Sequence, residues 1–135
     1  MLLLLILLGI IDFGRLLFVT QGVKSASREG ARVAVLDGAS ADSVRAVVDN
    51  AVGSAVALGA GGEATTTITN GSFASGVFVD EANQGTGPCN TGSAVAVQVE
   101  LSFRWLTPVG LLPGFNNPEL QGTRPVSSTT TMRCE

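Results

Sequence analysis

The feature that most constrains this chain is its beginning, an unbroken apolar run over residues 1–11. After a short break that contains Asp12 and Arg15, the apolar sequence continues through residues 16–19. A helix over residues 1–19 would be about 28 Å long, close to the roughly 30 Å hydrocarbon thickness of a bilayer. Because such a helix is apolar on nearly all sides, it needs lipid or partner helices to cover it.

Three interpretations of this segment are open. A secretory signal peptide would carry a basic n-region and a small-residue cleavage site, and the sequence has no clear match to either. A conventional membrane anchor would more often lack Asp12 and Arg15, because charges are costly in lipid. The third interpretation, which we favour, is a helix that lies in the membrane first and later packs against copies of itself. Asp12 and Arg15 are three residues apart, so we expect them to form a local pair on one helical face.

A stripe of apolar and small residues supports the third interpretation. Its members follow one another in steps of three and four, a spacing typical of helix–helix packing, and glycine on the stripe permits close approach. We predict that helix packing in an assembly involves Leu5, Gly9, Asp12, Arg15, Leu16, Val19, Val23, Ala26 and Gly30. From Val19 onward, an amphipathic helix that covers the core of its own domain is an equally good interpretation.

A second helix is predicted over residues 42–58. The first helix is expected to run to about Leu36, where Asp37 and Gly38 interrupt it. Asp42 is a candidate N-cap of the second helix, and Gly59 suits the position after its end. The apolar stripe of this helix comprises Val44, Val47, Val48, Ala51, Ala55 and Leu58.

The remaining sequence predicts antiparallel strands. Apolar and polar residues alternate over 95–105, which is the firmest strand prediction, and a last strand is expected over 126–134. Weaker strands are expected at 63–70 and 76–80, joined by a turn at Asn70-Gly71. The proline- and glycine-rich stretch 107–122 reads as a loop.

These elements define an α+β fold with a small antiparallel sheet after two helices. We expect the hydrophobic helix to occupy residues 1–36 and a globular head domain to occupy residues 37–135.

The composition leaves few residues for catalysis. There is no histidine and Lys24 is the only lysine, so histidine bases and histidine metal ligands are excluded. Charged residues make up 14% of the chain and the net charge is −3, which gives no basic field to attract nucleic acid. We therefore expect a structural protein that is not an enzyme and has no catalytic residue, cofactor, metal site or nucleic-acid partner.

Two segments carry a family resemblance, Gly9-Ile-Ile-Asp-Phe-Gly-Arg15 and Ser27-Arg-Glu-Gly-Ala-Arg32. They resemble the N-terminal region of TadE/TadG-like pilins, which are type IV pilin-like subunits of tight-adherence (Tad) pili. The stretch from Val126 to Glu135 also resembles the last strand of that family. The resemblance implies a subunit that is held in the cytoplasmic membrane and then assembled, by the pilus machinery, into an extracellular homo-oligomeric filament for adhesion. The alternative is a minor pilin or pseudopilin that acts as a membrane-anchored priming or adhesion module at the filament tip.

A head domain outside the cell would benefit from a covalent crosslink. Cys89 and Cys134 are the only cysteines, and both are expected near one end of the sheet. We predict a disulfide between them, which in the chain-entropy treatment would stabilise the head by about 4 kcal/mol.

Overall fold

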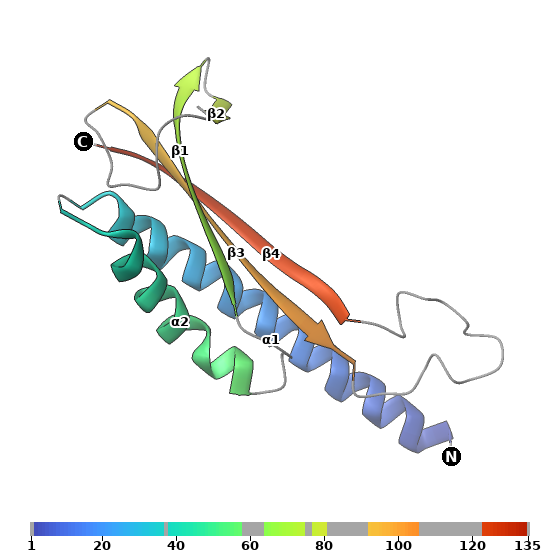
Figure 1. Ribbon diagram of the computed structural model, residues 1–135. Helices are drawn as coiled ribbons and strands as arrows, with labels where there is room; N and C mark the ends of the chain where they lie inside the picture. The colour runs from blue at the N-terminus through green and yellow to red at the C-terminus, as the bar shows by residue number, and fades with distance from the viewer. Residues whose placement is uncertain are drawn as a thin grey trace.

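In the described part of the chain, two helices pack on one face of a four-stranded antiparallel sheet (Figure 1). The computed structural model describes residues 2–36, 38–57, 64–74, 77–80, 92–105 and 123–134. The elements are α1 (Leu2–Ala34), α2 (Ala41–Ala57), β1 (Thr65–Ala74), β2 (Val77–Asp80), β3 (Ala94–Arg104) and β4 (Thr123–Arg133). The strand order is β2-β1-β3-β4, and every neighbouring pair is antiparallel. This arrangement confirms the predicted α+β class.

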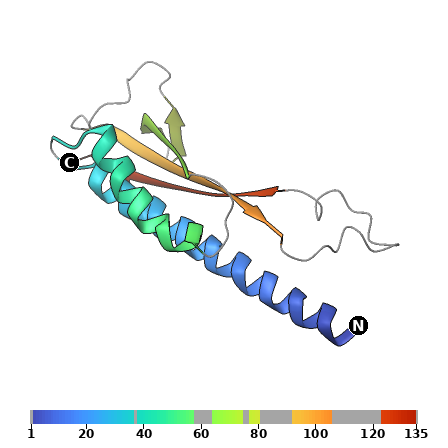
Figure 2. The ribbon, with the colours of Figure 1, turned by 60° about the horizontal axis from the view of Figure 1, so that its bottom comes forward.

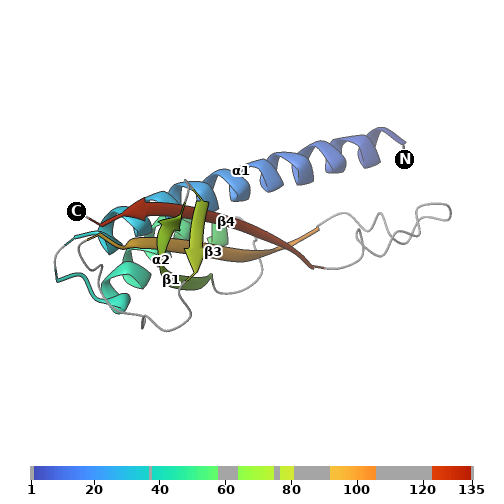
Figure 3. The ribbon, with the colours of Figure 1, turned by 90° about the horizontal axis from the view of Figure 1, so that it is seen from above.

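The long first helix extends well past the end of the sheet. Its N-terminal half projects beyond the strands, whereas its C-terminal half lies against the sheet and α2 (Figures 2 and 3). The helix ends at Ala34, slightly before the expected Leu36. After it, the backbone N–H of Leu36 donates to the carbonyl of Val33, and Gly38 adopts a φ of 78°. Positive φ values favour glycine, so Gly38 helps to reverse the chain toward α2.

Ser40 caps the second helix. The backbone N–H of Ser43 donates to the Ser40 hydroxyl at 3.2 Å, and the N–H of Ser40 donates to the Ser43 hydroxyl at 3.1 Å. This reciprocal arrangement is a capping box, in which two otherwise unpaired donors are satisfied. The prediction of Asp42 as the N-cap was therefore wrong: Asp42 lies in the first turn, where its charge complements the helix dipole. Leu58 and Gly59 lie outside the described residues.

The predicted turn at Asn70-Gly71 was also wrong. Strand β1 continues through both residues to Ala74, where it pairs with Val77 of β2. Gly71 is opposite Asp80 of β2 on one side and Ala94 of β3 on the other. Pairing on both sides satisfies the backbone groups of this central strand, and it overrides the local turn preference of the dipeptide.

Strand β3 is the centre of the head, as its alternation predicted. Its inward residues Val95, Val97, Val99, Leu101 and Phe103 are fully or almost fully buried. The edge strand β4 begins at Thr123, earlier than expected, and its half-buried residues alternate with exposed ones from Val126 onward. The predicted loop over 107–122 lies outside the described residues.

The core is formed between α1, α2 and the inner face of β3. From α1 it includes Val19, Val23, Ala26, Ala31 and Ala34, and from α2 it includes Val44, Val48, Val52 and Ala55. The stripe of α1 from Val19 onward therefore covers the core of its own domain.

Gly30 lets α1 approach both α2 and the sheet. A Cβ atom at this position would lie 2.7 Å from Cγ2 of Val48 and 3.2 Å from Cγ1 of Val97. Real Cβ atoms do not approach backbone-anchored branched side chains this closely, so any larger residue must push α1 away. By contrast, a Cβ added at Gly9 or Gly14 meets nothing within 4 Å.

We predict that Gly30→Ala destabilises the folded chain by about 1–3 kcal/mol, because the added methyl group overpacks the contact with Val48. The measurement is thermal unfolding of the full chain in detergent, followed by circular dichroism. Gly14→Ala is the control, and it should leave stability unchanged or raise it. A Gly30→Ala variant as stable as the parent would contradict the close approach, whereas partial rescue by Val48→Ala would support it.

Candidate functional site

The largest exposed apolar surface in the described chain is the N-terminal half of α1. We call residues 3–18 the apolar segment. Leu3 is 78% exposed and Ile10 is 67% exposed, and the other strongly exposed members are Leu4, Leu5, Ile6, Leu7, Ile11, Phe13, Leu17 and Phe18. Contiguous exposed surface of this kind marks a site for contact with a membrane or with another protein.

Among the described residues, α1 is the one helix that is long and apolar enough to cross a membrane, by length and composition. The segment forms a helix readily because leucine, which dominates its first turns, is a strong helix former. It also satisfies its backbone hydrogen bonds internally, as a segment surrounded by lipid must.

The predicted stripe divides into two parts in this structure. Leu5 and Gly9 are exposed, and a Cβ added at Gly9 meets nothing within 4 Å in the described chain. Leu16 is half-buried against the core, and the residues beyond it are buried under α2 and the sheet: Val19, Val23, Ala26 and Gly30. Within the described part of the chain, most of the apolar segment is therefore uncovered, whereas the second part of the stripe is buried.

Asp12 and Arg15 form the expected local pair. Nη1 of Arg15 lies 3.0 Å from Oδ1 of Asp12, and the two side chains are 16% and 3% exposed, respectively. The Arg15 guanidinium also lies over the ring of Phe103, 5.4 Å from its centroid. Phe103 in turn meets Trp105 edge-to-face, with ring centroids 5.3 Å apart.

This pair lies at the level where α1 leaves the sheet. The buried carboxylate compensates the half-buried cation, and the aromatic ring provides a second favourable contact for the guanidinium. The arrangement fixes the end of β3 against one turn of α1, so it sets how far the apolar segment projects from the head.

The sequence reasoning missed a hydroxyl cluster between α1 and β4. Ser27 is fully buried, and its hydroxyl donates to the Lys24 carbonyl at 3.1 Å. The same oxygen lies 3.1 Å from the Ser128 hydroxyl and 2.9 Å from the Thr130 hydroxyl. The only signal in the sequence is that small hydroxyl residues occupy the inward positions of the last strand next to Val126. These contacts fix the position of α1 along β4.

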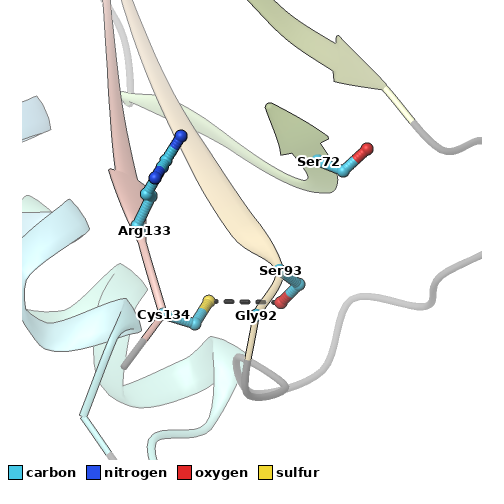
Figure 4. Close-up of a pocket in the computed structure, with 5 residues that line it drawn as sticks. All are labelled: Ser72, Gly92, Ser93, Arg133 and Cys134. Atoms are coloured by element: carbon cyan, nitrogen blue, oxygen red, sulfur yellow. Dashed lines mark hydrogen bonds between the residues drawn. The ribbon is translucent and has the colours of Figure 1, made fainter. Parts of the chain in front are cut away.

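A pocket of about 380 Å³ lies at the opposite end of the sheet from Trp105, and its lining includes Ser72, Gly92, Ser93, Arg133 and Cys134 (Figure 4). The Ser93 hydroxyl donates to Sγ of Cys134 at 3.2 Å, and the backbone N–H of Cys134 donates to the Ser93 carbonyl at 3.0 Å. Cys89, the predicted partner of Cys134, lies outside the described residues. Within the described chain, no three His, Cys, Asp or Glu side chains gather as a metal site would require.

Comparison with protein families matches residues 1–32 to the family described as TadE-like protein. The match covers the apolar segment, the Asp12–Arg15 pair and most of the part of α1 that packs on the head. The comparison with curated proteins found no match, and the comparison with solved structures found none either.

We predict that Asp12→Ala lowers the stability of the full chain in detergent by about 3 kcal/mol, because it removes the buried carboxylate that compensates the half-buried Arg15 cation. The double variant Asp12→Ala with Arg15→Ala should lose less. Thermal unfolding followed by circular dichroism measures the stability of both variants.

The control is the exposed pair of Asp42 and Arg45, which has the same spacing and a separation of 3.4 Å. Asp42→Ala should change stability by less than about 1 kcal/mol, since exposed pairs contribute little. Equal losses for Asp12→Ala and the double variant would show that the pair is not coupled.

Proposed function

We propose that this chain, whose residues 1–32 match the TadE-like family, is a structural, non-catalytic subunit of a Tad-type pilus. In this proposal the apolar segment holds the subunit in the cytoplasmic membrane until the assembly machinery transfers it into a filament. The filament is extracellular, consists of identical subunits and serves adhesion.

The observation that carries the proposal is the exposure of the apolar segment. Most of its large side chains are exposed. Full burial of such a side chain stabilises by about 1.5–3 kcal/mol relative to leaving it in water. A lipid bilayer and a bundle of equivalent helices are the two environments that would cover such a helix on all sides. A pilus subunit would have its apolar segment covered by the bilayer before assembly and by the helix bundle after it.

The part of α1 available to neighbouring subunits follows from its burial. Val19, Val23 and Ala26 are fully buried within the chain, so contacts between subunits fall on the apolar segment, including Leu5 and Gly9. Among the described residues, nothing lies within 4 Å of a Cβ added at Gly9, so another helix can approach its backbone closely.

The proposal includes a disulfide between Cys89 and Cys134. The support is positional: Cys89 is four residues before Ser93 in the sequence, and Ser93 contacts Cys134 directly. A bridge there would tie the end of β4 to the segment before β3 in an oxidising environment outside the cell.

We predict that the exported protein has no free thiol when it is unfolded without reductant and titrated with a thiol reagent. Cys134→Ser should lower the stability of the full chain by up to about 4 kcal/mol, because it opens the loop in the unfolded state. Ser93→Ala is the control, since it removes only the hydroxyl contact with Sγ and should cost less. Two titratable thiols would refute the bridge.

We predict that Ile10→Glu prevents filament formation, because a carboxylate in the helix bundle would be buried without a partner. The matched control is Leu36→Glu, which replaces a residue that is 60% exposed, compared with 67% for Ile10, but lies outside the apolar segment. The measurement is the yield of sheared surface filaments, with their dominant chain identified by mass spectrometry.

Normal filaments from the Ile10→Glu variant would overturn the proposed packing. If the dominant chain of the parent filaments is a different protein, this chain is not the main subunit, and the minor-pilin alternative replaces the proposal.

A further inference from the structure

Two exposed arginines lie at the end of the sheet nearest the apolar segment. Arg104 ends β3 opposite Thr123, and Arg124 on β4 is opposite Phe103. Successive residues of a strand point to opposite faces, and residues opposite each other on paired strands share a face. Phe103 is buried toward α1, so its partner Arg124 is on that face and Arg104 is on the outer face. The two cations therefore occupy both sides of one sheet end.

No ion pair joins either arginine to another described residue. Among the described acids, the nearest one on the face of Arg104 is Glu100, four residues earlier in β3 and therefore about 13 Å away. Asp12, the acid at this level of α1, is paired with Arg15. This end of the described sheet is consequently positive, in a chain whose net charge is −3.

The position of these arginines along the axis of α1 follows from the contact between Arg15 and Phe103. The Arg15 guanidinium lies over Phe103, so the end of β3 is level with Arg15 along α1. Exposed apolar side chains continue beyond that level to Leu17 and Phe18. Phe18 is three residues past Arg15, about 4.5 Å farther along the helix axis. When the exposed face of α1 is covered by lipid as far as Phe18, the sheet end is at the depth of the headgroups.

We propose that Arg104 and Arg124, at the strand end that holds the half-buried Trp105, form a membrane collar, a surface that binds the headgroups of anionic lipids before the subunit leaves the membrane. The inference rests on the membrane-anchored state proposed above. Lipid fits better than a protein partner because the collar is continuous with the apolar segment and lies at its edge. Arginine near a membrane surface is attracted to anionic headgroups, and such headgroups would complement both cations.

The only tryptophan of the chain provides the test, because Trp105 directly follows Arg104 of the collar. The full chain is reconstituted into vesicles of phosphatidylcholine alone or mixed with phosphatidylglycerol, each with lipids brominated near the headgroup. Flotation first establishes association with the vesicles, and quenching of Trp105 fluorescence by bromine then reports the position of the collar. We expect stronger quenching in the anionic vesicles.

The double variant Arg104→Gln with Arg124→Gln should still float but should lose the difference between the two lipid compositions. Each arginine removed should weaken the binding of the collar to anionic headgroups about fivefold. The matched control is Arg28→Gln with Arg32→Gln, which removes the same charge from exposed positions toward the other end of α1 and should behave like the parent.

The outcomes separate this proposal from the function on which it rests. Flotation without quenching of Trp105 overturns the collar and leaves the membrane anchor in place. Failure to float overturns both. Quenching that is unchanged in the arginine double variant overturns the role of the two cations, and if that variant also assembles poorly, the arginines bind a neighbouring subunit instead.

Discussion

The packing of α1 against its own head is the contact on which the rest of this molecule depends. It is made with small side chains and hydroxyls: Gly30 lets the helix approach Val48 and Val97, and Ser27 reaches Ser128 and Thr130. Because the helix is continuous from Leu2 to Ala34, fixing its second half also fixes the direction of the apolar first half. One rigid element therefore joins two parts of the chain that need different surroundings, water for the head and lipid or protein for the projecting helix.

The pair of Asp12 and Arg15 marks the boundary between those parts. Its position under the end of β3 explains why two charges are tolerated within an apolar sequence: each is compensated inside the subunit, and Phe103 covers the cation. A pair that is satisfied locally needs no partner from another chain when the surroundings change. The energetic penalty of moving the helix between lipid and protein is accordingly smaller than for two unpaired charges.

Much of this fold could be predicted from the sequence, because the signals were periodic. The apolar steps of α1 and the alternation in β3 identified the elements and their buried faces. Periodicity identifies a face but not its neighbour, so it could not tell whether Val19 and Val23 would be covered by α2 and the sheet or by copies of α1. Local preferences gave a wrong prediction where a longer-range contact competed. Asn70-Gly71 favours a turn, but the pairing of β1 with β2 and β3 keeps both residues within a strand. Ser40 and Asp42 are both good capping residues, and only the structure distinguishes them.

The hydroxyl cluster has a consequence for the order of events during biogenesis. Ser27 and its partners on β4 are 101 and 103 residues apart in sequence. The helix α1 is synthesised long before β4, so its contacts with β4 can form only after the last strand has been made. Contacts of such long range also form slowly. If the apolar segment enters the bilayer during that interval, the head folds onto a helix that lipid already covers. Membrane insertion would then protect the uncovered helix from aggregation until the last strand is added.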